Sequence, residues 1–141
     1  MSAPAFNDVR VGQQLPHLSV VLDRARLVRY AAASGDLNPI HYDEHTAREV
    51  GLPDVIAHGM LTMGAAVEAV SRWAGHGGRV VLYQTKFTAP VPVPRAQPAV
   101  IEVDGTVAKV DRETRQVTID LTVTSGGSKV LGRPLVIVRL D

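Results

Sequence analysis

The sequence predicts an α+β domain in which helices come first and one antiparallel sheet follows. Three segments with helical spacing or helix caps lie before residue 75, and four long segments of alternating apolar residues lie after it. A length of 141 residues fits one domain, so we expect a single unit over residues 1–141. The prediction is therefore a set of helices segregated from a single sheet.

The helical part follows a short β-rich segment at residues 17–22. A helix over residues 23–35 is expected because the Asp at its start can cap it and the Gly at its end suits a left-handed cap. A second, short helix capped by Asp43 is expected through Val50. Over residues 60–73 apolar residues recur every three or four positions between small ones, which is typical of a helix buried on most sides. We expect the sheet to curl around this third helix.

The strands are predicted from a change of period to two. Residues 80–88 alternate up to Pro90, residues 100–110 and 116–124 alternate around a polar turn, and residues 129–140 form the last strand. Gly126 and Gly127 indicate a hairpin, and residues 132–134 indicate a bulge or kink in the last strand. A sheet of this length has an open edge, so we expect two such sheets to pair in a dimer.

The composition excludes several classes of function. The chain has no cysteine, which rules out disulfides and a Cys nucleophile and suits a cytoplasmic location. Fifteen Lys and Arg residues balance fourteen Asp and Glu residues, and aromatic residues make up only 4%, so no nucleic-acid partner is expected. No apolar run has the length of a membrane span and no export signal is visible, so no membrane association is expected.

The chemistry is concentrated in the loop after the first helix. Asp36 and His41 lie five positions apart with the turn-forming pair Asn38-Pro39 between them, so the carboxylate and the imidazole can face each other. A histidine titrates near neutral pH and suits general acid–base catalysis. Gly59 lies at the start of the third helix, where an amide free of a nearby Cβ could hold a developing oxyanion.

A metal site is the alternative interpretation of these histidines. His41 and His45 have a spacing that can bind zinc on a helix, and His58 could add a third ligand. The proline before His41 and the lack of a His-Glu-x-x-His arrangement argue against it. We therefore expect no metal and no other cofactor.

Two runs of residues carry a resemblance to a known family. They are Tyr30-x3-Ser34-Gly35-Asp36-x-Asn38-Pro39-Ile40-His41-x-Asp43 and Ala57-His58-Gly59-Met60. With these runs the chain resembles the MaoC-like (R)-specific enoyl hydratases and dehydratases of the hot-dog fold, over nearly all of its length. It most resembles the catalytic B-type subunit of the (3R)-hydroxyacyl-carrier-protein dehydratase of type II, mycolate-style fatty-acid synthesis.

The resemblance implies roles for individual residues. Asp36 and His41 would be the catalytic dyad and Gly59 the oxyanion donor, while Asn38, His58 and Met60 would lie against the substrate. The substrate would be an acyl thioester of carrier protein or coenzyme A, and the assembly a homodimer or a heterodimer with a paralogous hot-dog subunit. A non-catalytic thioester-binding subunit of such a heterodimer is the alternative, against which the intact dyad argues. An acidic carrier would need cations near the site, and the available ones are Arg72, Arg79, Lys86, Arg95 and Arg133.

Overall fold

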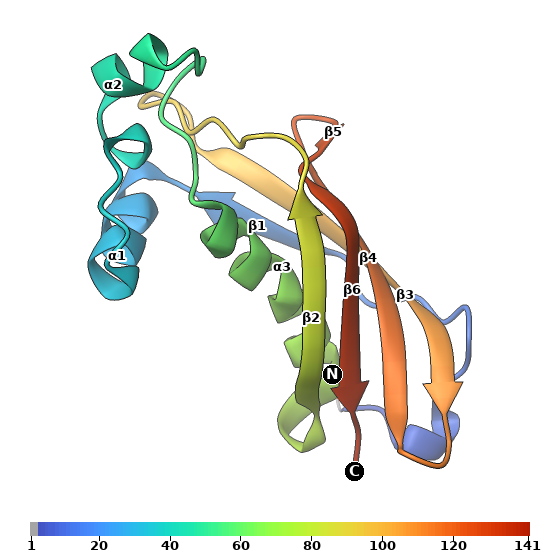
Figure 1. Cartoon of the computed structure of the whole chain (residues 1–141). Helices are drawn as coiled ribbons and strands as arrows, with labels where there is room; N and C mark the ends of the chain where they lie inside the picture. The colour runs from blue at the N-terminus through green and yellow to red at the C-terminus, as the bar shows by residue number, and fades with distance from the viewer. Residues whose placement is uncertain (1–2) are drawn as a thin grey trace.

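The computed structural model describes residues 3–141 and contains one curved antiparallel sheet with a long helix against it (Figure 1). The helices are α1 (Arg24–Ser34), α2 (Glu44–Glu49) and α3 (Gly59–Ala74). Short 3-10 turns lie at η1 (Phe6–Asp8), η2 (Pro39–His41) and η3 (Gly75–Gly77). The strands are β1 (Leu18–Leu22), β2 (Arg79–Phe87), β3 (Ala99–Asp111), β4 (Gln116–Ser125), β5 (Ser128–Lys129) and β6 (Leu131–Arg139). The predicted order of helices before strands is confirmed.

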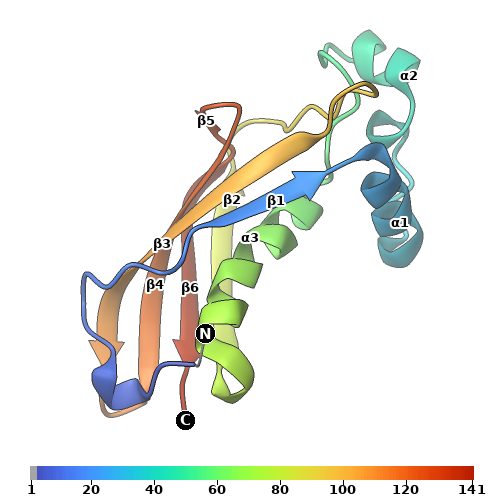
Figure 2. The same ribbon diagram turned by 180° about the vertical axis from the view of Figure 1, so that it is seen from behind.

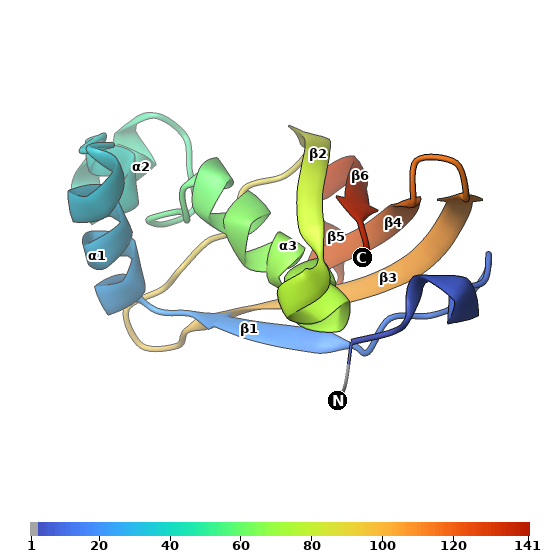
Figure 3. The ribbon, with the colours of Figure 1, turned by 90° about the horizontal axis from the view of Figure 1, so that it is seen from below.

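The sheet wraps around α3, as predicted. Its strand order is β1-β3-β4-β6-β2, with β5 paired to β4, and all pairs are antiparallel. Seen from below, α3 lies inside the curve of the sheet, while α1 and α2 lie beyond one end of it (Figures 2 and 3). Apolar residues of α3 and of the inner sheet face form the buried core, among them Ala66, Val70, Val103, Ile119 and Val136.

The last strand differs from the prediction. Residues 129–140 do not form one strand, because Lys129 pairs with Thr124 of β4 while Leu131 pairs with Phe87 of β2. The predicted hairpin at Gly126 and Gly127 is confirmed, and both residues have positive φ, which favours glycine. After this tight turn β5 pairs briefly with β4, and the next strand, β6, then pairs with β2.

The predicted bulge in the last strand is also confirmed. Gln84 of β2 pairs with Leu135 and Lys86 pairs with Gly132, so two residues of β6 stand opposite one of β2. Arg133 lies in this bulge with a φ of 47°. Such a bulge bends the strand and increases the local twist, which suits a sheet that curves around a helix.

Strands β1 and β2 are the two edges of the sheet. Strand β2 is largely exposed, and the side chains of Val80, Val81 and Leu82 on it are accessible. Tyr83 anchors this strand, since its hydroxyl donates to the Met63 carbonyl of α3 at 2.8 Å. Among the described residues, no helix has both the length and the apolar character needed to span a membrane.

Candidate active site

The loop between α1 and η2 is built from consecutive turns of side chain onto backbone. Helix α1 ends at Gly35, which has the left-handed φ of 75° that glycine adopts without strain. The amide of Asn38 then donates to Asp36 Oδ1 and the amide of Ile40 donates to Asn38 Oδ1, both at 3.2 Å. Asp36 and Asn38 therefore order their own loop, as Asx turns do. The Asp36 side chain keeps its second oxygen, Oδ2, for other contacts.

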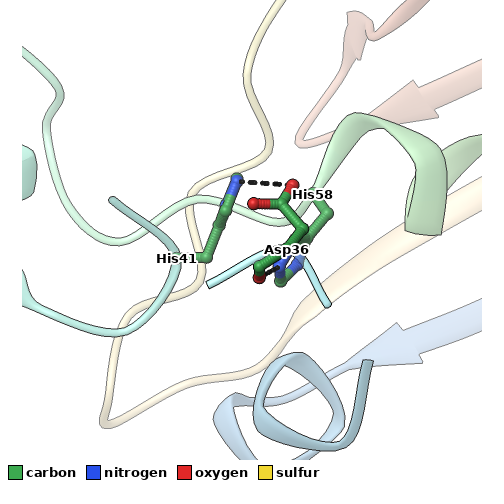
Figure 4. A group of neighbouring side chains, drawn as sticks. All are labelled: Asp36, His41 and His58. Atoms are coloured by element: carbon green, nitrogen blue, oxygen red, sulfur yellow. Dashed lines mark hydrogen bonds and ion pairs between the residues drawn. The ribbon is translucent and has the colours of Figure 1, made fainter. Parts of the chain in front are cut away.

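His41 faces this oxygen from the end of η2. Its Nε2 atom lies 3.9 Å from Asp36 Oδ2, and its ring is largely buried (Figure 4). Its Nδ1 atom lies 2.7 Å from the Ile56 carbonyl oxygen. Because a carbonyl only accepts, Nδ1 must carry the proton. The lone pair of neutral His41 is therefore on Nε2, on the side of Asp36. At 3.9 Å from Oδ2 it makes no hydrogen bond there and is available to accept a proton, as a general base requires.

His58 lies against the other side of His41. The two rings are stacked with their centroids 3.8 Å apart and an angle of 21° between their planes. The His58 side chain is 1% exposed, its Nε2 lies 3.2 Å from the Asp36 carbonyl oxygen, and the Tyr30 ring packs on it at 4.7 Å. Burial lowers the pKa of His58 from its ordinary value. His58 therefore occupies the interior of the site rather than its surface.

Gly59 is the first residue of α3, and His58 is its N-cap residue. The His58 side chain makes no capping hydrogen bond, so the first amides of α3 have no side-chain partner among residues 3–141. A Cβ on Gly59 would lie 3.0 Å from Cε1 of Phe87, so the Phe87 ring covers this position closely. A cavity of about 200 Å³ opens here, lined in part by Gly59, Thr62, Phe87 and Ala89. A helix N-terminus beside a cavity is a suitable place for an anionic oxygen.

A backbone framework holds these parts together. Ile56 donates its amide to the Ile40 carbonyl at 3.2 Å while accepting from His41, so η2 is fixed to the segment before α3. That segment pairs in turn with the proline-rich connection between β2 and β3, through the Ala57 amide to Val91 and the Val93 amide to Val55. The partly buried Arg24 of α1 adds a cross-link, since its Nη2 lies 2.8 Å from Asp54 Oδ1.

The structure brings together most of the residues that the sequence singled out. Asp36, His41 and His58 approach one another within 4.8 Å, and Gly59 follows His58 directly. Asn38 and Met60 are both exposed to solvent. Asn38 lies in the loop after α1, and Met60 lies in the first turn of α3. Two further groups at the site, the Ile56 carbonyl and the Phe87 ring, could not be predicted from the sequence, because both contacts arise only from tertiary packing.

The metal alternative does not fit this geometry. The exposed side chain of His45 pairs with Glu49 on α2, and it does not join Asp36, His41 and His58 in the cluster found among the described residues. In the cluster itself, nitrogen lone pairs lie in the planes of the rings, so two stacked rings cannot both direct a nitrogen at a common ion. The donor set suits proton transfer better than metal binding.

Comparison with known proteins decides the family. The family described as "MaoC like domain" matches residues 7–126 of the chain. The chain belongs to the MaoC-like hydratase and dehydratase family. It is 33% identical over 128 residues to an (R)-specific enoyl-CoA hydratase of Rhodospirillum rubrum, an alignment that covers 89% of this chain and 85% of that protein.

Solved structures agree with this MaoC-like assignment. A protein titled "MaoC-like dehydratase" superposes with a TM-score of 0.94 at 43% identity, covering 99% of this chain and 43% of that one. The (R)-hydratase from A. caviae involved in PHA biosynthesis superposes with a TM-score of 0.85 at 24% identity, covering 95% and 98%, and shows the same hot-dog fold. Some matched proteins are much longer, since this chain covers only 24% of one curated relative.

Proposed function

We propose that this chain interconverts (3R)-hydroxyacyl and trans-2-enoyl thioesters, as an (R)-specific hydratase and dehydratase of fatty-acid metabolism. The observation that carries the proposal is the Nε2 lone pair of His41 facing the Asp36 carboxylate beside the uncapped amide of Gly59. The (R) configuration is taken from the name of the R. rubrum relative. No metal or redox cofactor takes part in the proposed reaction.

In the dehydration direction, we propose that the thioester carbonyl accepts a hydrogen bond from the Gly59 amide. His41 Nε2 removes a proton from C2, and the negative charge that develops on the carbonyl oxygen is held at the N-terminus of α3. The C2=C3 double bond then forms as the C3–O bond breaks, and Asp36, which enters this direction of the reaction as the carboxylic acid, donates the proton with which the hydroxyl leaves as water. The proton gained by His41 can return to Asp36, since the two groups face each other at 3.9 Å.

In hydration the same steps run in reverse. The pair activates a water molecule that attacks C3, and C2 receives a proton. Asn38 and Met60 are proposed to contact the substrate, because both are exposed beside the dyad and the Gly59 amide. The resemblance also implies a substrate contact for His58, but its 1% exposure supports a role in the interior of the site instead.

The test is to purify the chain and follow the loss of the conjugated enoyl absorbance with crotonyl-CoA and a longer trans-2-enoyl-CoA. Asp36→Asn and His41→Ala should each lower the rate about 10²- to 10⁴-fold, which is the usual contribution of a general acid or base. Circular dichroism should show both variants folded. Hydration at the wild-type rate in both variants would refute the proposed chemistry.

The cations near the site bear on which carrier holds the acyl group. Arg72 pairs with Glu68 and Arg95 with Glu44, so these cations are engaged within the chain. Lys86 and Arg133 are both exposed and come from neighbouring strands, since Lys86 pairs with Gly132, the residue before Arg133. Lys86 also precedes Phe87, whose ring lies against Gly59. We infer that these two cations contribute to docking an acidic carrier protein.

Added salt separates the two carriers. It should raise the KM of an enoyl carrier protein more steeply than that of the matching enoyl-CoA, because charge attraction across an exposed interface is screened. Equal salt dependence for both substrates would argue against a basic docking surface. Lys86→Ala should reduce the salt dependence for the carrier-protein substrate alone.

The assembly is proposed to be a homodimer or a heterodimer with a paralogous hot-dog subunit, paired along the exposed edge strand β2. The exposed apolar side chains of Val80, Val81 and Leu82 on β2 support this pairing. If the folded chain alone is inactive and a paralogous subunit restores hydration, mutation of Asp36 then shows which subunit catalyses. Activity that survives Asp36→Asn in the mixture would favour the alternative of a non-catalytic thioester-binding subunit.

Two further expectations remain predictions. We infer that residues 1–141 make one hot-dog unit, which the match over residues 7–126 supports. A cytoplasmic location is inferred from the absence of cysteine in the sequence.

A further inference from the structure

His58 makes contacts that a residue touching substrate does not need. Its ring is 1% exposed and lies between the His41 ring at 3.8 Å and the Tyr30 ring at 4.7 Å. Its Nε2 reaches the backbone carbonyl of Asp36, the residue that carries the dyad carboxylate. A single side chain therefore touches both members of the Asp36–His41 pair while being shielded from solvent.

The hydrogen bond fixes the state of the His58 ring. The Asp36 carbonyl can only accept, so Nε2 of His58 carries the proton. The remaining nitrogen, Nδ1, is buried and has no hydrogen-bond partner in the described structure. A second proton on Nδ1 would be a buried donor without an acceptor, which is costly, so the ring stays neutral.

We propose that His58 is a positioning residue that holds the Asp36 backbone and the His41 ring in the geometry required for proton transfer. The hydrogen bond from His58 to the Asp36 carbonyl attaches the loop after α1 to the N-cap position of α3. The stacked ring fixes the plane of His41, so that Nε2 of His41 points at the Asp36 carboxylate. This role concerns the dyad rather than substrate contact, and its kinetic part rests on the proposed function.

Neutrality of His58 matters for the neighbouring ring. His41 becomes an imidazolium when it accepts the substrate proton, and a second cation stacked at 3.8 Å would oppose that step. The groups that face His58 are Tyr30 from α1, Asp36 from the loop and His41 from η2. A neutral ring at this position adds no positive charge beside His41 when His41 accepts the substrate proton.

The first experiment reads the tautomer without any enzyme assay. Nitrogen-15 NMR of the histidine side chains in the wild-type protein should show His58 with Nε2 protonated and Nδ1 unprotonated throughout the neutral range. The His41 ring should show the opposite tautomer, protonated at Nδ1. A His58 ring protonated at Nδ1, or charged at neutral pH, would overturn the proposal even if hydratase activity is absent.

The second experiment uses matched substitutions at position 58. His58→Phe retains an aromatic ring but removes the donor, and we expect kcat for enoyl-CoA hydration to fall about ten- to hundredfold. The KM should change less than about threefold, since substrate contacts are retained. The amide resonance of Asn38, which donates to Asp36 Oδ1, should shift in this variant because the loop loses its anchor.

His58→Gln and His58→Asn provide a comparison if the Phe variant does not fold. The Gln side chain can place an N–H near the position of Nε2, while the Asn side chain is one carbon shorter and falls short of the Asp36 carbonyl. Gln should therefore retain several times more kcat than Asn. Equal kcat in the two, a wild-type kcat in His58→Phe, or a loss confined to KM would each overturn the positioning role.

A stability control separates positioning from general loss of structure. Val70→Ala removes core volume from α3, well after its first turn, and should lower the Tm without changing kcat. If Val70→Ala and His58→Phe reduce kcat alike at equal loss of Tm, the effect of His58 is structural only and the proposal is wrong. If the wild-type protein shows no hydration either alone or with a paralogous subunit, the proposed function fails, while the tautomer still decides on His58.

Discussion

At Gly59 a side chain would meet the Phe87 ring, which lies against this position. A Cβ there would lie 3.0 Å from Phe87 Cε1, closer than ordinary van der Waals contact, so the ring would have to shift and the added methyl group would crowd the first amide of α3. We therefore expect Gly59→Ala to lower kcat/KM for enoyl-CoA hydration about tenfold or more, because the oxyanion would lose access to that amide. Steady-state kinetics checks this expectation.

Gly64 provides the matched control on the same helix. It is exposed in α3, and no atom lies within 4 Å of a Cβ built on it. Gly64→Ala should retain activity and raise the free energy of unfolding by about 0.5–1 kcal/mol, since alanine is the better helix former. An equal loss of activity in both glycine variants would mean that helix α3 tolerates no methyl group, and the special role of Gly59 would be lost.

The grouping of the proposed catalytic residues could be predicted from the sequence because their signals are local. Asp36, Asn38 and His41 lie within six residues, and turn chemistry alone places them on one loop. The Ile56 carbonyl, which fixes the tautomer of His41, could not be predicted in this way. It reaches the ring only because residues 55–57 pair with the segment around Val91 and Val93, and single-sequence patterns do not specify such pairings.

At the scale of elements, His17 joins β1 to β3 on the sheet surface. Its Nδ1 lies 2.8 Å from Asp104 Oδ1 and its Nε2 lies 2.7 Å from Glu102 Oε2, both residues of β3. Hydrogen bonds to Asp104 and Glu102 raise the pKa of His17 above its ordinary value of 6.5. The folded protein therefore holds the His17 proton more tightly than the unfolded chain does.

The sign of the pH dependence follows from that difference. The stabilisation by His17 is fully present below pH about 6.5 and is lost as the pH rises through the raised pKa of the folded state. His17→Gln should thus lower the Tm near pH 6 and have little effect near pH 9, as thermal unfolding at the two pH values can check. The effect should be small, since the pair is exposed. A Tm loss that grows with rising pH would contradict this account.

Local sequence patterns were sufficient to predict the bounds of some elements but not of others. The α3 helix and the strands β2 to β4 follow the predicted periodicity, and the bulge around Arg133 was visible as Gly-Arg-Pro. The division of the last predicted strand into β5 and β6 was not visible. Both parts have the same strand-like composition and both pair with β4. They separate at residue 130, where pairing of Lys129 with Thr124 of β4 gives way to pairing of Leu131 with Phe87 of β2.

At the scale of the whole molecule, the two edges of the sheet differ. Strand β1 is short and continues into α1, whereas β2 is nine residues long and exposes Val80, Val81 and Leu82. Phe87 at the end of β2 is 55% exposed and Met60 of α3 is 58% exposed. A long apolar edge strand is a template for pairing with another chain, so we expect a dimer that covers β2 and brings its partner close to the site.

A single charge on that edge tests the expectation. Val81→Lys should convert the dimer to a monomer, because a lysine on an edge strand opposes strand pairing and would be buried in the interface. Val28→Lys on α1 and Val21→Lys on β1 introduce the same charge at positions of similar exposure, 58% and 52% against 50% for Val81, and should leave the dimer intact. Analytical ultracentrifugation gives the masses. If Val21→Lys dissociates the dimer instead, the interface lies on β1. If the wild-type protein is already a monomer, pairing with a paralogous subunit is favoured, because the exposed apolar strand β2 would still need a partner.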